Sequence, residues 1–181
     1  MKGAAGREAL LVLRSQSGDR EALDALLASV QGPLYRYLLS LLRERHLAEE
    51  ALQETFVRVY RKLAWLREPG LFRPWAYRIA TREAFRQLRR ERRWAEQVRD
   101  EDELKAVAAP PPREEVAPEL AARLRETVAT LPPASRAVVV LYYLHELSLE
   151  ETAAVLGVPL GTVKSRLAYG LEALRRRLGE S

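Results

Sequence analysis

Apolar side chains recur at steps of three and four residues over the first third of the chain, which is the spacing of amphipathic helices. The first stripe falls between residues 19 and 45 and consists of Leu23, Leu26, Leu27, Val30, Leu34, Leu38 and Leu41. Gly32-Pro33 interrupts it, so we expect a break or kink at that point. A second stripe predicts a helix over residues 47–63 and consists of Leu52, Phe56, Val59 and Leu63.

A third helix is expected after the turn signal Pro69-Gly70. Proline is favoured in the first turn of a helix, so Pro74 marks its approximate start, and the pattern continues through Leu88 into a run of arginines. No strand alternation occurs in this part of the sequence, which favours an all-α fold.

The composition changes over residues 95–118 to acidic residues, alanine and the triple proline at 110–112, which indicates a linker. Residues 120–131 then predict a fourth helix, which ends at Pro132-Pro133. Residues 135–146 contain the run VVVLYYL, whose local propensity also fits a buried strand. Its helical surroundings favour a helix.

The chain has 181 residues and a net charge of +5, which allows one medium domain or two small ones. Residues 1–94 carry 19 basic and 11 acidic side chains, whereas residues 95–118 carry 3 and 7. The basic first half makes polyanion binding plausible. No segment approaches a membrane span or a signal-peptide core, so we expect a cytoplasmic protein without a membrane partner.

The sequence contains no cysteine and only two histidines, His46 and His145. Disulfides, thiolate zinc sites and cysteine nucleophiles are therefore excluded. The two histidines lie about 100 residues apart in sequence without an acid at ligand spacing, and we interpret them as structural or surface residues. We predict no catalytic residue, no metal site and no cofactor.

Residues 148–178 predict a helix-turn-helix. Ser148 and Glu151 form a capping-box pattern at the start of the first helix, and Gly157 suits the tight turn before a second helix from about Thr162. Val163 and Leu167 would anchor that second helix. The outer face, where a recognition helix meets DNA, would carry Lys164, Ser165, Ala168 and Tyr169. The alternative is an ordinary helical hairpin.

Aromatic and basic side chains interleave over residues 72–82, a pattern that suits stacking on unpaired bases. Five arginines then follow at steps of three or four residues and share one helix face, namely Arg78, Arg82, Arg86, Arg89 and Arg93. Such a stripe can be a solvated surface, but eight arginines against two glutamates over residues 72–93 favour nucleic-acid binding. Of Trp75 and Tyr77, we expect one to lie in the core.

Glu50, Gln53 and Glu54 lie at i, i+3 and i+4, opposite the Leu52 and Phe56 stripe. They form an acidic patch on an otherwise basic domain. The patch either solvates its helix or forms a docking face for a basic partner.

From residue 18 to residue 178 the chain resembles a bacterial RNA polymerase sigma factor of the compact extracytoplasmic-function (ECF) type. Three segments carry the resemblance: AEEALQETF at 48–56, WAYRIA at 75–80, and LPP at 131–133 followed by GTVKSRL at 161–167. The resemblance implies two helical domains, namely region 2 over residues 1–94 and region 4, with the helix-turn-helix, over residues 119–181. A linker over residues 95–118 would join them.

The resemblance also implies the functional surfaces. Glu50, Gln53 and Glu54 would bind the clamp helices of the polymerase core. The −10 promoter element would be recognised and melted by the loop 65–72 and the following helix, through Leu71, Phe72, Arg73, Trp75, Tyr77, Arg78, Arg82, Arg86 and Arg89. The −35 element would be read by Thr162, Lys164, Ser165, Arg166, Ala168 and Tyr169, and the same domain would contact the polymerase flap. An anti-sigma protein is a further implied partner.

Two positions depart from the pattern of this family. Arg82 stands where many members carry asparagine, and Tyr169-Gly170 stands where members often have a basic residue in the recognition helix. Three other classes remain as alternatives. A stand-alone helix-turn-helix regulator would leave the arginine stripe unexplained. A small hydrolase would need a phosphate-binding glycine loop, which this sequence lacks. The last alternative is a helical adaptor with no DNA role.

Overall fold

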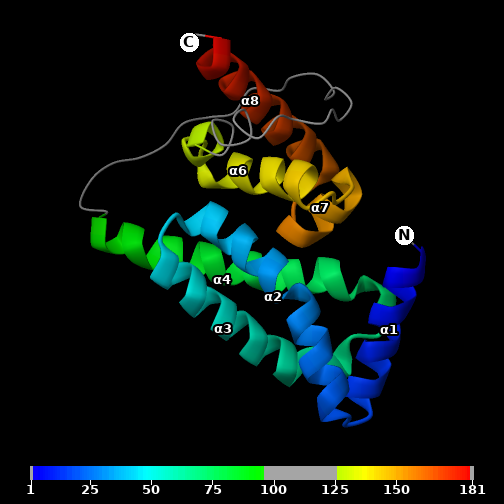
Figure 1. Ribbon diagram of the computed structural model, residues 1–181. Helices are drawn as coiled ribbons and strands as arrows, with labels where there is room; N and C mark the ends of the chain where they lie inside the picture. The colour runs from blue at the N-terminus through cyan, green and yellow to red at the C-terminus, as the bar shows by residue number, and fades with distance from the viewer. Residues whose placement is uncertain (1, 96–125, 180–181) are drawn as a thin grey trace. The chain divides into compact units, whose positions relative to one another are not determined.

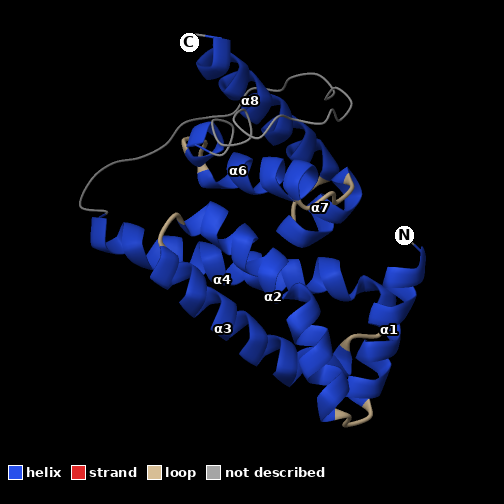
Figure 2. Cartoon of the chain, in the orientation of Figure 1, coloured by secondary structure: helices blue, strands red, loops and turns tan. Residues whose placement is uncertain are grey.

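The computed structural model describes residues 2–95 and 126–179. Within these ranges every regular element is a helix and no strand is present (Figure 2), which confirms the predicted all-α fold. The chain divides into two compact units, unit 1 over Met1–Trp94 and unit 2 over Ala95–Ser181. The predicted linker and the first part of the predicted helix 120–131 lie outside the described residues.

Unit 1 consists of four α-helices and two short 3-10 turns (Figure 1). The helices are α1 (Lys2–Gln16), α2 (Arg20–Leu42), α3 (Arg45–Lys62) and α4 (Phe72–Ala95), and the turns between α3 and α4 are η1 (Leu63–Trp65) and η2 (Pro69–Leu71). Helix α2 packs against both α1 and α3, and α1 contacts both turns. The predicted helices over 47–63 and from Pro74 correspond to α3 and α4. The hydrophobic pattern did not predict α1.

The core of unit 1 is built from the predicted stripe of α2. Five of its members are at most 1% exposed, namely Leu26, Val30, Leu34, Leu38 and Leu41. Helix α2 runs unbroken through Pro33, which excludes the break but not the kink that we predicted there, and its ribbon changes direction partway along its length (Figure 1). Proline inside a helix costs about 3 kcal/mol. The buried side chains that follow it, including the fully buried Tyr37, offset that cost because they pack only if the helix continues.

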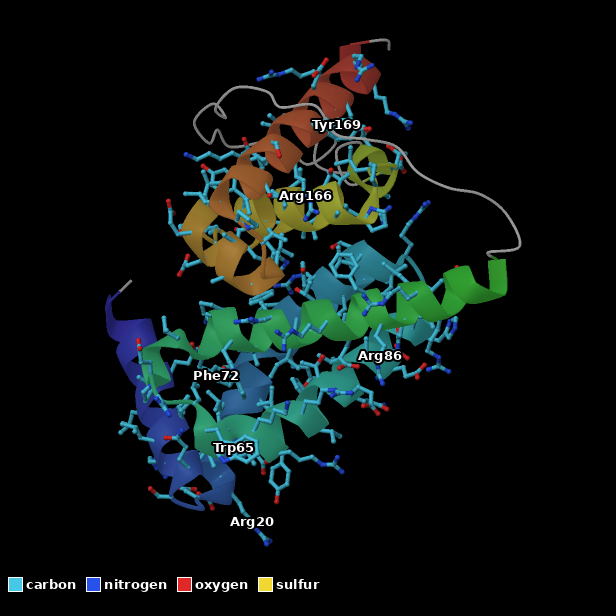
Figure 3. The ribbon with its side chains drawn as sticks, turned by 180° about the vertical axis from the view of Figure 1, so that it is seen from behind. Arg20, Trp65, Phe72, Arg86, Arg166 and Tyr169 are labelled. Carbon is cyan, nitrogen blue, oxygen red and sulfur yellow. The ribbon has the colours of Figure 1, made fainter. Side chains whose placement is uncertain are left out.

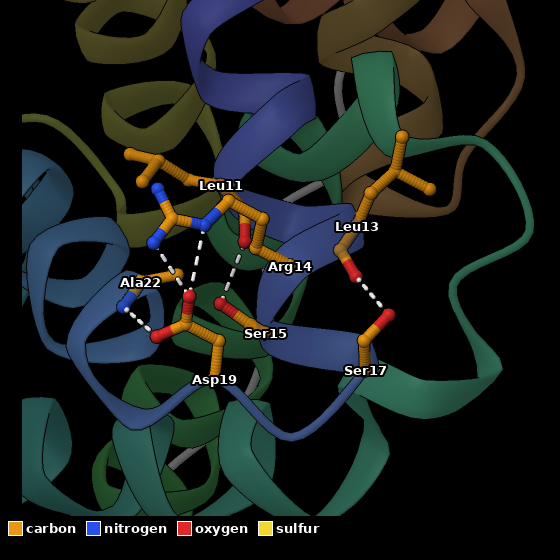
Figure 4. A network of polar contacts seen from close by, with 7 residues as sticks. All are labelled: Leu11, Leu13, Arg14, Ser15, Ser17, Asp19 and Ala22. Atoms are coloured by element: carbon orange, nitrogen blue, oxygen red, sulfur yellow. Dashed lines mark hydrogen bonds and ion pairs between the residues drawn. The ribbon is translucent and has the colours of Figure 1, made fainter.

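The junction between α1 and α2 is fixed by polar contacts (Figure 4). Gly18 turns the chain with a φ of 93°, a conformation that suits glycine. Asp19 caps α2, because its Oδ1 accepts from the Ala22 backbone N–H at 3.0 Å and its Oδ2 accepts from Arg14 Nε and Nη2 at 2.8 and 2.6 Å. The Ala22 N–H, and then Arg14, hold the pKa of Asp19 below its usual value.

A buried hydroxyl pair joins α2 to α4. Tyr37 Oη lies 2.8 Å from Thr81 Oγ1, and Thr81 Oγ1 also donates to the Tyr77 carbonyl oxygen at 2.7 Å. The Tyr37 and Tyr77 rings meet edge to face with their centroids 5.3 Å apart. Burial raises the pKa of Tyr37, and it raises the pKa of Tyr77 to about 12, so both phenols remain neutral and act as packing groups with polar ends.

Unit 2 contains α6 (Pro133–Val139), the π-helical turn η3 (Val140–Leu144), α7 (Leu149–Leu156) and α8 (Leu160–Gly179). Residues 135–144 are therefore helical, and the choice of helix over strand is confirmed. Ala137, Val138, Val140 and Leu141 are fully buried, and α8 packs against both α6 and α7. The first four residues of the VVVLYYL run thus belong to the core of unit 2, whereas Leu144 at its end is 50% exposed.

Candidate nucleic-acid interface

The face of α4 that carries the arginines is separated from a face of small side chains. Arg78, Arg82, Arg86 and Arg89 are exposed, whereas Ala76, Ala80 and Ala84 have no exposed surface. A methyl group every fourth residue lets α4 pack closely against its neighbours. Because the small side chains fix which face is buried, the long basic side chains project into solvent, as the spacing predicts.

A single buried acid lies among these cations. Glu83 of α4 is 4% exposed and forms ion pairs with Arg58 of α3 and with Arg86. These pairs join α3 to α4 and give Arg86 a fixed partner. A pocket of about 430 Å³ opens here, lined by Arg58, Lys62, Ile79, Arg82, Glu83, Arg86 and Arg89. Five cations against one carboxylate make it a strongly positive concavity, which suits a phosphate-bearing ligand.

The acidic patch of α3 lies beside the arginine stripe. Glu50 and Gln53 are exposed and Glu54 is half-exposed. Glu54 Oε2 lies 3.8 Å from Arg86 Nη2, and Glu50 Oε1 lies 4.0 Å from Arg90 Nη1. At these distances and exposures the pairs contribute little stability. The carboxylates are therefore accessible to a partner that brings its own cations.

The loop between α3 and α4 combines buried and exposed apolar side chains. Trp65 is 76% exposed and Leu71 is 48% exposed. Figure 3 shows Trp65 and Phe72 at one end of unit 1, with Arg86 farther along α4. Two large exposed apolar side chains on one loop, next to a stripe of exposed arginines, make the loop a candidate contact surface. The sequence analysis placed Trp65 in the loop but did not single it out, because its exposure follows from the tertiary fold alone.

Two of the residues predicted to contact the −10 element lie in the core of unit 1. Phe72 is fully buried and packs against Trp75, with ring centroids 6.2 Å apart. Tyr77 is 3% exposed and packs against Tyr37. Both residues belong to the core of unit 1, because the buried face of α4 includes positions beside the alanines as well. Trp75 is half-buried, so the expectation that one of Trp75 and Tyr77 belongs to the core holds for Tyr77.

Arg73 is half-exposed and pairs with Glu8 of α1, with Nε and Oε2 2.7 Å apart. Burial raises the pKa of Glu8, and the charge and hydrogen bond of Arg73 act in the opposite direction. Three other residues beside the arginine stripe were missed by the sequence analysis, namely Arg58, Lys62 and Glu83. The one signal for them was the spacing of Arg58 and Lys62, which lie four residues apart on α3.

Unit 2 contains the predicted helix-turn-helix. Both hydrogen bonds of the capping box are present: the Glu151 N–H donates to Ser148 Oγ at 3.0 Å and the Ser148 N–H donates to Glu151 Oε2 at 2.8 Å. Gly157 ends α7 in the left-handed conformation with a φ of 68°. Val163 and Leu167 are fully buried and anchor α8.

Three of the four side chains predicted for the outer face of α8 have exposed surface. Lys164 is exposed, and four side chains are partly exposed, namely Thr162, Ser165, Arg166 and Tyr169; Figure 3 labels Arg166 and Tyr169 on α8. Ala168 is only 6% exposed, so its predicted place on the outer face is wrong. Helix α8 packs against two helices, which widens its buried face, and the short methyl group of Ala168 falls within it.

Gly170 is a packing position. A Cβ atom there would lie 2.8 Å from Val139 Cγ2 of α6 and 3.6 Å from Leu131 Cδ1. The departure from the family pattern at Tyr169-Gly170 therefore has two parts. Tyr169 changes the partly exposed face, whereas Gly170 permits the close approach of α8 to α6.

Within the described ranges no group of three or more histidine, cysteine, aspartate or glutamate side chains could hold a metal ion. Among the helices of those same ranges, none is both long and apolar enough to cross a membrane.

Comparison with known families matches both units. The profile described as "Sigma-70 region 2" matches residues 26–94, and that described as "Sigma-70, region 4" matches residues 128–176. The ECF RNA polymerase sigma factor SigW of Bacillus subtilis is 30% identical over 172 residues, with 90% of this chain and 92% of SigW covered. The ECF RNA polymerase sigma factor SigE of Mycolicibacterium smegmatis is 37% identical over 169 residues, covering 91% of this chain and 65% of SigE.

Solved structures agree with these matches. The structure of CnrH in complex with the cytosolic domain of CnrY is similar to this chain with a TM-score of 0.71 at 26% identity, over 97% of this chain and 99% of CnrH. The sigma factor RpoE from Bartonella quintana, solved with the anti-sigma factor NepR, shares the fold with a TM-score of 0.66 at 22% identity, over 86% of this chain and 96% of RpoE. The chain belongs to the ECF sigma factors of the sigma-70 family, and it directs promoter-specific transcription initiation by RNA polymerase.

Proposed function

We propose that the loop between α3 and α4, together with the exposed arginines of α4, binds the −10 element as a melted strand. The proposed contacts are Trp65, Leu71, Arg73, Trp75, Arg78, Arg82, Arg86 and Arg89. The observation that carries this proposal is the combination of two exposed apolar side chains with a stripe of exposed cations on the adjoining helix. Apolar and aromatic groups receive unstacked bases, and the arginines neutralise the phosphates that connect them.

The acidic patch of Glu50, Gln53 and Glu54 is the proposed docking surface for the clamp helices of polymerase. Its two carboxylates, those of Glu54 and Glu50, lie no closer than 3.8 Å to Arg86 and Arg90. Such long, exposed pairs can be exchanged for pairs with a basic partner at little cost. Docking there would place polymerase next to the arginine stripe, so core binding and −10 binding would use neighbouring surfaces of unit 1.

The −35 element is the proposed ligand of unit 2. Lys164 and Arg166 would supply charged contacts to bases or phosphates, and Thr162, Ser165 and Tyr169 would supply hydroxyl contacts. Ala168 is too deeply buried for direct base contact and is not included. We also propose that unit 2 contacts the polymerase flap, as the family resemblance implies.

We propose that the protein acts in the cytoplasm as a specificity subunit without an active site of its own. An anti-sigma protein is a proposed partner. The family resemblance implies such a protein, and CnrH, which is similar in fold over 97% of this chain, was solved bound to the cytosolic domain of CnrY. We also propose the domain assignment that the family resemblance implies, with region 2 over residues 1–94, a linker over 95–118 and region 4 over 119–181.

The experiment is run-off transcription from pooled genomic fragments with bacterial core polymerase, with and without the protein. New 5′ ends that share spaced upstream motifs are expected only when the protein is present. Glu54→Arg should abolish these starts through lost core binding. Arg78→Ala should reduce them and lower the salt dependence of DNA binding by about one phosphate contact.

The matched controls are Asp24→Arg and Arg20→Ala, which change exposed residues of α2 outside both surfaces. They should leave the starts unchanged. If no new starts appear while the protein alone binds a duplex tightly, the chain is a conventional helix-turn-helix regulator and the proposal is wrong.

A further inference from the structure

Helix α1 lies before residue 26, where the region 2 match begins, yet it is joined to the loop proposed to read the −10 element. It contacts η1 and η2, which together make up most of that loop. Glu8, Val12 and Gln16 follow one another on α1 at steps of four residues, and Gln16 and Glu8 contact residues at the two ends of this loop. This spacing places them on one helix face, over a length of about 12 Å.

Gln16 holds the beginning of the loop. Its Nε2 donates both hydrogens, to the Leu63 carbonyl oxygen at 2.8 Å and to the Leu66 carbonyl oxygen at 2.9 Å. These two carbonyls lie on either side of Trp65, whose side chain is 76% exposed. The amide therefore fixes the backbone around the most exposed aromatic ring of the described residues without covering the ring itself.

Glu8 holds the end of the loop. It is 9% exposed and pairs with Arg73, the second residue of α4. Between the two polar positions, Val12 is fully buried and presses the same face of α1 into the unit. The loop is thus fastened at both ends by side chains from one helix, while Trp65 and Leu71 between those ends remain available to a ligand.

We propose that α1 holds the −10-reading loop in its binding conformation, with Gln16 and Glu8 as positioning residues that do not themselves touch DNA. This inference rests on the proposed function of the loop. A loop that is already ordered loses less conformational entropy when it captures a base than a loop that must be ordered on binding. The contacts of α1 with the loop should therefore increase the affinity for the −10 element and the discrimination between its bases, and they should leave core binding unchanged.

The test uses the full chain assembled with core polymerase. The probe is a single-stranded non-template oligonucleotide that carries the −10 segment of a promoter mapped by run-off transcription. A second oligonucleotide differs from it at one −10 base. Gln16→Leu keeps the side-chain size and removes both donors. Gln31→Leu makes the same chemical change on an exposed part of α2 and is the matched control.

We expect Gln16→Leu to reduce the affinity ratio between the two oligonucleotides about tenfold, since two hydrogen bonds of ordinary strength are removed. Core affinity should stay within twofold of the wild type, and Gln31→Leu should match the wild type in every measurement. A merely structural role would lower the folded fraction and reduce core and oligonucleotide binding together. Urea unfolding followed by tryptophan fluorescence reports that folded fraction, because all three tryptophans, at positions 65, 75 and 94, belong to unit 1.

Glu8 supplies a second, independent variant in case Gln16→Leu does not fold. Glu8→Leu removes the partner of Arg73 and should lower the same affinity ratio. Glu8→Gln keeps an acceptor oxygen at the same place and should restore most of it. If the folded Gln16→Leu and Glu8→Leu variants both discriminate between the two oligonucleotides as the wild type does, the proposed role of α1 is refuted. If the wild-type holoenzyme itself does not distinguish the two oligonucleotides, the proposed function of the loop fails instead.

Discussion

Replacing Gly170 by alanine should destabilise unit 2, although alanine is the better helix former. Gly170 lies within α8, on the face that meets α6. The added Cβ atom would lie 2.8 Å from Val139 Cγ2, which is 0.6 Å short of the 3.4 Å at which ordinary van der Waals contact begins. Val139 is 3% exposed and β-branched, so its side chain has few alternative rotamers with which to yield.

The magnitude follows from two opposing effects. Alanine in a helix interior is favoured over glycine by roughly 0.5–1 kcal/mol. Forcing an extra methyl group into a packed core costs typically about 1–3 kcal/mol. Since the contact is with a rigid, buried side chain, we expect the packing cost to dominate. The net loss in the free energy of unfolding of unit 2 should be about 1–2 kcal/mol.

The assay is amide hydrogen exchange of the full chain in increasing urea, read on peptides from α6 and α8. Tryptophan fluorescence in the same samples reports unit 1, which should not change. Gly161→Ala is the matched control, because a Cβ atom at Gly161 meets nothing within 4 Å; it should leave unit 2 as stable as before or slightly more so. Val139→Ala combined with Gly170→Ala should cost less than the two changes added together. A Gly170→Ala protein as stable as the wild type, or additivity within about 0.5 kcal/mol, would refute the packing argument.

Three further predictions concern stability. Asp19→Asn keeps a capping side chain but loses the charge that pairs with Arg14. Because the pKa of Asp19 is lowered in the folded state, the wild type should be more stable than this variant at pH 7 and should lose that advantage as the pH falls below 3.8. Urea unfolding at several pH values measures the difference. Ser148→Ala removes half of the capping box and should cost unit 2 about 1 kcal/mol, measured by hydrogen exchange of α7. Tyr37→Phe removes a buried hydroxyl that is hydrogen-bonded and should cost unit 1 about 1 kcal/mol in the urea titration, whereas Tyr60→Phe on the surface should cost nothing measurable.

The helices whose stability depends on an apolar stripe could be predicted from the sequence. Residues 19–45, 47–63 and 148–178 each bury most of the positions that periodicity selects, while Leu23, Leu27 and Phe56 are only partly buried. The capping box at Ser148 forms as its spacing requires. Helix α1 could not be predicted in this way. Its apolar residues occur as one short run, of which Val12 is fully buried and Leu10 and Leu13 are exposed. Its attachment to the loop between α3 and α4 depends on polar contacts with residues more than 45 positions away, which no local pattern reveals.

The aromatic residues near the start of α4 show a second limit of sequence reasoning. The pattern of aromatic and basic residues indicated a surface for unpaired bases, but it could not separate side chains that contact a ligand from those that support the surface. Phe72 and Tyr77 are buried because partners distant in sequence surround them, and Trp65 is exposed because the turn η1 directs it outward. The class of ligand was therefore predictable, whereas the division of roles required the tertiary contacts.

Glu83 explains how a folded helix can carry so many exposed cations. Arginines on one helix face repel one another, and burying a lone carboxylate beside them would be costly without partners. Glu83 reduces the repulsion and has the partners that its burial needs, because it is 4% exposed and forms ion pairs with Arg58 from α3 and Arg86 from α4. The same carboxylate thus joins two helices, lowers the repulsion within the stripe and leaves Arg78, Arg82 and Arg89 directed outward. The positive surface is in this way a product of the core that lies beneath it.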